Sequence, residues 1–112
     1  GSTTTNLQQG LAKCWVNFDG TASGAASRDS FNVSGMTDNG TGDHTVSINN
    51  DMANVNYASS CSGGNTSSGR YNIIADSDGK ATGSSGFFGF QTSTGGALDN
   101  AEVSVSFFGD LA

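Results

Sequence analysis

The sequence predicts an all-β fold, an antiparallel β-sandwich of jelly-roll or immunoglobulin-like type with about seven to eight short strands. Half of the 112 residues are Gly (17), Ser (17), Thr (11) or Asn (11), and these types favour turns and polar strand faces over helices. One Trp, two Tyr and seven Phe accompany a charged share of only 12%, which is unlike a disordered chain. Several segments also alternate apolar and polar residues, as half-buried strands do.

The length is that of one domain. We expect residues 12–112 to form a single β-sandwich and residues 1–11 to form an amino-terminal arm, in which Gly1-Ser2 is interpreted as an expression scar. Leu7 and Leu11 are spaced four apart, so one helical turn of the arm could lie across a sheet.

The first half of the chain contains the clearest alternation. Residues 12–18 place Cys14, Val16 and Phe18 on one face and Trp15 on the other. Segments 30–34 and 44–49 also alternate, and the T-D-N-G-T-G-D between them predicts a β-hairpin because Asn-Gly readily adopts positive φ. Residues 51–55 are expected to form a short helical turn capped by Asn49 or Asn50.

The second half is predicted to alternate strands with long polar loops. Strands are expected at 70–75, 87–90 and 102–108, and loops at 62–69 and 76–86. The F-F-G-F segment is apolar on both faces, and its glycine suits a bulge or a close approach of another backbone.

The inward positions of these strands predict the core. Its members are expected to be Cys14, Val16, Phe18, Phe31, Val33, Val46, Ile48, Val55, Tyr57, Tyr71, Ile73, Phe88, Phe90, Val103, Val105 and Phe107. Trp15, Ile74, Phe87 and Phe108 fall on the opposite parity, which predicts a second apolar face. That face could be covered by the Leu7 and Leu11 turn or a second sheet, could form a homo-oligomer interface, or could be a stacking platform for a ligand.

Composition and motifs argue against several functions. Four basic residues against ten acidic ones disfavour nucleic-acid binding, and no segment has the length of a membrane span. Cys14 and Cys61 are expected to be free buried thiols, with a disulfide as the alternative. We expect no catalytic residue, no metal and no cofactor, since His44 lacks a nucleophile partner and turn composition accounts for Asp76 and Asp78.

Several stretches resemble a module near the carboxy termini of tailed-bacteriophage virion proteins, especially those of marine podoviruses and cyanophages. They are N-L-Q-Q-G-L-A-K-C-W-V-N-F-D-G-T (6–21), R-D-S-F-N-V-S (28–34), M-T-D-N-G-T-G-D-H-T-V (36–46), N-V-N-Y (54–57) and V-S-V-S-F-F-G-D (103–110). The resemblance implies a non-enzymatic domain on the virion surface, of tail-fibre, receptor-binding or knob-like type, and a homotrimer as in fibre tips. It carries over no catalytic residue.

Two functions follow from that resemblance. The domain is either a tail-fibre tip that touches host cell-surface polysaccharide or another receptor, or a knob-like capsid decoration that contacts other virion proteins. Receptor contacts are predicted in the polar loops 62–70 and 76–86, which carry Asn65, Arg70, Asp78 and Lys80. Trp15, Ile74 and Phe108 are predicted to form the oligomer interface or covered second face.

Overall fold

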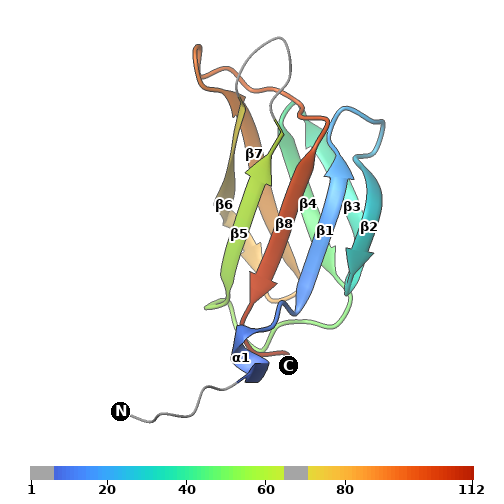
Figure 1. Ribbon diagram of the computed structural model, residues 1–112, viewed down its shortest axis with the longest axis vertical. Helices are drawn as coiled ribbons and strands as arrows, with labels where there is room; N and C mark the ends of the chain where they lie inside the picture. The colour runs from blue at the N-terminus through green and yellow to red at the C-terminus, as the bar shows by residue number, and fades with distance from the viewer. Residues whose placement is uncertain (1–6, 65–70) are drawn as a thin grey trace.

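The computed structural model describes residues 7–64 and 71–112, which form two packed antiparallel sheets (Figure 1). Within the described residues there are eight strands and one short helix: α1 (Leu7–Gly10), β1 (Cys14–Asp19), β2 (Ala26–Phe31), β3 (Val33–Gly40), β4 (Asp43–Ile48), β5 (Ala58–Gly63), β6 (Tyr71–Ala81), β7 (Ser84–Gln91) and β8 (Val103–Phe108). The predicted all-β antiparallel sandwich is confirmed.

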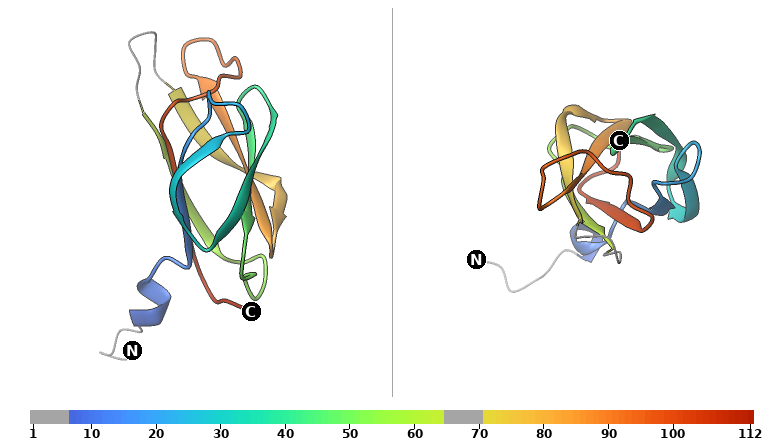
Figure 2. Two further views of the ribbon diagram at one scale, coloured as in Figure 1. Left: turned by 90° about the vertical axis from the view of Figure 1, so that its right-hand side faces the viewer. Right: turned by 90° about the horizontal axis from the view of Figure 1, so that it is seen from above.

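The first sheet has the strand order β2-β1-β8-β5 and the second has the order β3-β4-β7-β6. The first and last strands of the chain are therefore neighbours at the centre of the first sheet, while β4 and β7 occupy the centre of the second (Figures 1 and 2). We call the end that carries α1 and the carboxy terminus the basal end, and the opposite end, closed by the β7–β8 connection, the apical end (Figure 1). No helix among the described residues is long and apolar enough to cross a bilayer.

The core lies between the sheets and centres on Phe107 of β8. Phe107 is fully buried, and its ring centroid lies 5.8 Å from that of Phe87 and 5.5 Å from that of Tyr57. Ten predicted core residues are buried: Cys14, Val16, Phe18, Val46, Ile48, Tyr57, Ile73, Val103, Val105 and Phe107. Val33 is partly buried against this cluster, and the side chain of Tyr71 lies outside the described part.

Four other core predictions are wrong. Phe31 and Val55 are 54% and 48% exposed, because β2 is an edge strand whose side chains are all exposed and Val55 lies in the segment before β5. Phe88 and Phe90 are only partly buried, whereas Phe87, predicted to point outward, is 1% exposed.

Strand pairing explains the reversed parity of β7. Phe87 pairs with His44, and both side chains point into the core, whereas Phe88 pairs with Ile74 of β6 on the outer face. An F-F-G-F segment offers apolar residues to both faces, so the neighbouring strands decide which of them is buried.

Three local predictions are also corrected. Residues 76–86 are not a loop, since β6 continues to Ala81 and β7 begins at Ser84. Residues 51–55 form no helical turn, because Met52 bridges to Leu111 in an extended conformation. Leu7 and Leu11 are 74% and 52% exposed, and α1 lies at the basal end (Figure 1), so they do not cover a sheet.

A hairpin around the T-D-N-G-T-G-D turn is confirmed, although the turn is tighter than predicted. The predicted strand 30–34 is wrong, because β2 ends at Phe31 and β3 begins at Val33 in the other sheet, with Asn32 between them at a φ of 59°. β3 runs through the Asn-Gly pair to Gly40, and the turn is formed by Thr41 and Gly42. Gly42 has a φ of 74°, a conformation that is costly for other residue types.

Both cysteines are free thiols. Cys14 on β1 is fully buried, and this burial raises the pKa of its thiol from 9.0 to about 11. Partial burial also raises the pKa of Cys61. The predicted free thiols are confirmed, and the folded state favours the neutral form of both.

Adjacent phenylalanines provide a matched test of the packing. We expect Phe87→Ala to lower the free energy of unfolding by about 3–5 kcal/mol, as is usual for removing a buried aromatic ring. Phe88→Ala should cost well under half as much, because that ring is only partly buried on the outer face. Urea denaturation of both variants measures this difference. Equal losses would contradict the parity of β7.

The buried thiol predicts a decline of stability at alkaline pH. The unfolded chain ionises Cys14 near its ordinary pKa while the folded state keeps the proton, so stability present below about pH 9 is lost as the pH rises toward about 11. Each unit of pKa difference is worth about 1.4 kcal/mol. Urea unfolding of the wild type and Cys14→Ala from about pH 7 to about pH 10.5 should therefore give a steeper decline for the wild type. An equal decline of stability with pH in the wild type and in Cys14→Ala would contradict the raised pKa of Cys14.

Candidate functional site

The outer face of the first sheet brings together side chains from four strands in two rows. The strand register aligns Phe31, Trp15, Ser106 and Ser60 in one row, and Asp29, Asn17, Ser104 and Ser62 in the next. Figure 1 shows this face toward the viewer, with β8 between β1 and β5. We call the hollow lined by Trp15, Asn17, Ser60, Ser62, Ser104 and Ser106 the serine groove.

Side-chain size gives the groove its shape. Outward positions of β8 and β5 carry serines, which leave the floor low, while Trp15 on β1 rises beside them as a wall. The hollow is open and has a volume of about 290 Å³, which is near the lower limit of roughly 300 Å³ for small-molecule sites. It could hold part of an extended ligand.

Hydroxyl groups dominate the floor of the groove. Neighbouring strands lie about 4.8 Å apart and alternate residues about 7 Å apart, so the four serines form a regular grid. The hydroxyls of Ser60, Ser62 and Ser106 make no hydrogen bond to another described residue. Asn17 Nδ2 donates to Ser104 Oγ at 3.0 Å and to Glu102 Oε1 at 2.7 Å, which fixes one end of the groove.

The two cations nearest the groove already have partners within the protein. Arg28 is the additional residue at a bulge in β2, and its guanidinium lies 3.4 Å from a Glu102 oxygen and 3.7 Å from an Asp19 oxygen. Hydrogen bonds from Thr21, together with Arg28, lower the pKa of the Asp19 carboxyl. Lys13, toward the basal end, donates to the carbonyls of Gln8 and Leu11. These contacts leave neither cation as a ready partner for an anionic ligand.

The three residues predicted for the second apolar face do not share one surface. Trp15 and Phe108 both lie on the outer face of the first sheet, where Phe108 pairs with Ala58 nearer the basal end. Ile74 is 47% exposed on the outer face of the second sheet, beside Phe88. The sandwich therefore has two separate outer faces with apolar residues.

Of the four predicted receptor residues, the structure describes only the side chain of Lys80. Asn65, Arg70 and the side chain of Asp78 lie outside the described part of the structure. Lys80 lies in β6, where its ammonium donates to the Tyr57 carbonyl and sits 4.3 Å from the centre of the Tyr57 ring. Lys80 is the last residue but one of β6, and β6 begins at the apical end and runs toward the basal end (Figure 1).

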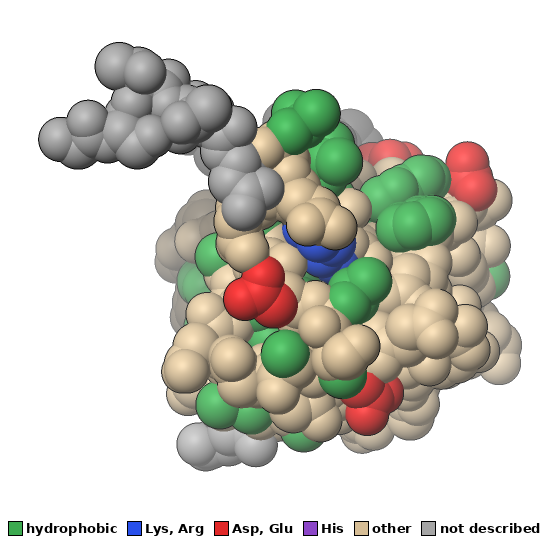
Figure 3. All heavy atoms as spheres, turned by 90° about the horizontal axis from the view of Figure 1, so that it is seen from below, with side chains coloured by type: hydrophobic (Ala, Val, Ile, Leu, Met, Phe, Trp, Pro, Cys, Tyr) green, Lys and Arg blue, Asp and Glu red, His purple; other side chains and the backbone are tan. Residues whose placement is uncertain are grey.

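The basal end offers only scattered apolar groups. Figure 3 shows hydrophobic side chains separated by polar atoms, with acidic groups between them. Leu111 is 43% exposed there, and a small hollow is lined by Gln8, Gln9, Lys13, Asp110 and Leu111. Gln9 donates to Asp110 across this hollow, so the contact joins α1 to the carboxy-terminal segment.

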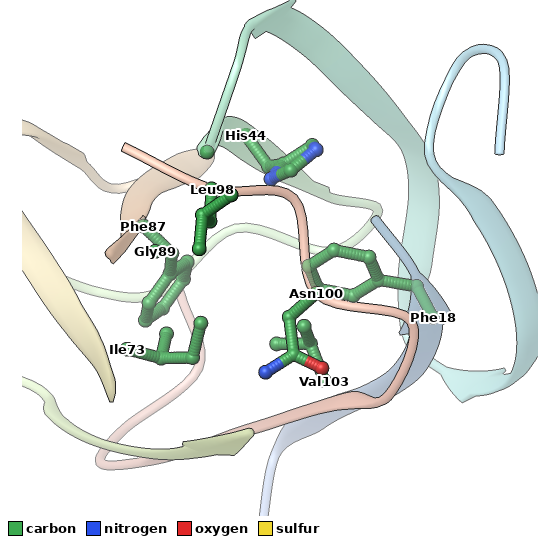
Figure 4. Close-up of a pocket in the computed structure, with 9 residues that line it drawn as sticks. Phe18, His44, Ile73, Phe87, Gly89, Leu98, Asn100 and Val103 are labelled. Carbon is green, nitrogen blue, oxygen red and sulfur yellow. The ribbon is translucent and has the colours of Figure 1, made fainter. Parts of the chain in front are cut away.

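A second cavity lies at the apical end, inside the sandwich (Figure 4). His44, Phe18, Leu98 and Asn100 contribute to its walls, but its volume is about 10 Å³, at most that of one water molecule. His44 Nε2 is buried without a hydrogen-bond partner, 3.9 Å from Asp99 and 4.0 Å from Asp38. No group of three or more metal-ligating side chains occurs in the described residues.

The β7–β8 connection closes the apical end through Asn100, which is 2% exposed. Asn100 Nδ2 donates to the Gly64 carbonyl at 3.0 Å, and its Oδ1 accepts the Glu102 amide hydrogen at 2.9 Å. At Gly89, an added Cβ would lie 2.9 Å from the Leu98 carbonyl oxygen, so the predicted close backbone approach is confirmed. Sequence reasoning missed Asn100, because asparagine is common throughout this chain.

Asn100→Ala should therefore destabilise the apical end. Both hydrogen bonds are lost and the partly buried Gly64 carbonyl loses this partner, so we expect the free energy of unfolding to fall by about 1–3 kcal/mol. Faster exchange of the Glu102 amide hydrogen, measured by NMR, would locate the effect. The exposed Asn72→Ala serves as the control, and an equal loss in both variants would contradict this role.

Comparison with protein families, with curated proteins and with solved structures finds no match. A function therefore has to be argued from the chain itself, and the serine groove is the feature of the structure that we use for it.

Proposed function

We propose that this chain is a non-enzymatic bacteriophage virion-surface domain of the tail-fibre or receptor-binding type, which contacts the host cell surface. Two independent lines support the proposal. Five sequence stretches resemble surface modules of phage virion proteins, and the sandwich presents a hollowed outer face lined by an aromatic ring, an amide and hydroxyls. Such a face is suited to binding.

The observation that carries the proposal is Trp15 on the outer face. Its neighbours on β1, Cys14 and Val16, fill the core, whereas Trp15 borders the groove. A partly exposed aromatic ring contributes less to folding than a buried ring, and it is the kind of side chain that dominates binding surfaces.

The alternative is a knob-like decoration domain attached to the capsid, with a structural or adhesive role. The outer face of the second sheet favours it, because Ile74 and Phe88 form an apolar spot that could contact another virion protein. Ala75, Asp76 and Ser77 border this spot. In that case the domain is a monomer when purified.

Two measurements on the purified domain separate these functions. A receptor-binding tip should have a mass by light scattering of three times the 11.3 kDa chain, and the fluorescently labelled domain should bind cells of a susceptible bacterial host. A monomer that binds no cells but binds virions lacking the domain would support the knob-like function instead. A labelled Phe107→Ala variant, unfolded or weakened by loss of a core ring, controls for nonspecific adhesion.

A further inference from the structure

We infer that the serine groove is a binding site for a neutral, hydroxyl-rich polysaccharide segment, with one sugar ring stacked on Trp15 and its neighbours lying over the serine floor. The inference rests on the proposed function and deepens it, because it assigns the ligand class and the site. It also moves the site from the loops predicted by the sequence to the strands β1, β8 and β5.

The stacking surface comes from the first row of the sheet. Trp15 pairs with Phe31 on β2 and with Ser106 on β8, and Phe31 is 54% exposed. Two aromatic residues thus occupy paired positions on neighbouring strands, and Trp15 borders the low floor. The C–H face of a sugar ring is apolar and complements an aromatic ring, while the edge of the sugar ring carries hydroxyls that need polar partners.

The polar partners lie within the same groove. Ser106, Ser60 and Ser62 carry hydroxyls without protein partners among the described residues, and each can both donate and accept a hydrogen bond. Sugar hydroxyls have the same dual capacity. A floor made only of carboxylates or ammonium groups would not match a ligand that alternates donors and acceptors in this way.

Charge selects a neutral polymer over an acidic one. Arg28 is engaged by Glu102 and Asp19, and Asp29 lies in the second row of the face. With a net charge of −6, the domain repels polyanions, and the described residues place no unpaired cation in the groove that could offset this repulsion. An anionic polysaccharide is therefore disfavoured.

The geometry suits a chain rather than a single sugar. The groove is open, and its floor follows adjacent strands rather than ending in a closed pocket. Its residues lie on strands whose backbones are held by hydrogen bonds to neighbouring strands, so little conformational freedom is lost on binding. Each sugar ring contributes modestly, and several rings together give the affinity.

Trp15 is the only tryptophan in the chain, so intrinsic fluorescence reports directly on the groove. We expect its emission to shift on titration with at least one of three neutral polymers: dextran, galactomannan and hydroxyethyl cellulose. Alginate, an acidic polymer, should leave the emission unchanged. A response to alginate alone, or none to the three neutral polymers, would overturn the inference.

Retardation in native gels that contain the responsive polymer tests the residues. Trp15→Ala should weaken binding about tenfold or more and Trp15→Phe by less, while Ser106→Val should weaken it between about twofold and tenfold. Ile74→Ala, an exposed apolar residue on the other sheet, should bind like the wild type. Urea denaturation verifies that each variant is folded. Unchanged retardation of folded Trp15→Ala overturns the inference.

Two further outcomes separate this inference from the proposed function. If the labelled domain binds host cells and Trp15→Ala binds them equally, the groove assignment fails and the receptor-binding function stands. If the domain binds a neutral polymer through Trp15 but binds no host cell, the assignment stands and the proposed function fails. A change of oligomeric mass in Trp15→Ala would show that a second copy covers the face, and would overturn the inference.

Discussion

The packing of Phe107 against Phe87 across the two sheets determines much of the rest of the structure. Once Phe107 points inward, the alternation of β8 buries Val105 and Val103 as well and turns Ser106 and Ser104 outward. Ser104 and Ser106 of the serine floor thus lie on the outer face of the same strand, β8, whose inner face fills the core. They cannot change position unless the contact between Phe107 and Phe87 changes as well. A one-residue slip of β8 would place two serines among the core rings and expose three large apolar side chains.

The sequence was sufficient where one face of a strand is apolar and the other polar. β1, β4 and β8 meet that condition, and their inward residues are as predicted. The prediction was wrong for β7, because Phe87, Phe88 and Phe90 are apolar residues on both faces of the strand. Pairing with β4 and β6 determines which of them is buried. The polar end of β6 was mistaken for a loop because its side chains show no apolar alternation and its register with β7 is interrupted between Asp76 and Ala81.

The candidate site could be predicted only in part. The outward position of Trp15 follows from the alternation of β1 alone, but its serine neighbours come from strands more than 40 residues away in the sequence. No local pattern distinguishes these serines from the other thirteen in the chain. Their role depends on the pairing of β8 with both β1 and β5, which is a property of the topology. The polarity of the predicted loops, by contrast, indicated Lys80 as a receptor residue, whereas in the structure its ammonium lies over the Tyr57 ring.

A shallow groove on a rigid sheet affects the affinity with which such a domain would bind a cell surface. In the proposed complex few groups would contact each sugar, so a single site would bind weakly. Linked sites convert later contacts into intramolecular ones and raise the overall affinity by factors of about 10² to 10⁴ without any new contact. A repetitive polysaccharide and a domain displayed in several copies meet that requirement together. The separate apolar spot at Ile74 and Phe88, on the opposite outer face, could then contact a neighbouring copy while the serine groove stays open. Assembly and recognition would in this arrangement use different sheets of one small sandwich, so that either can change without disturbing the other.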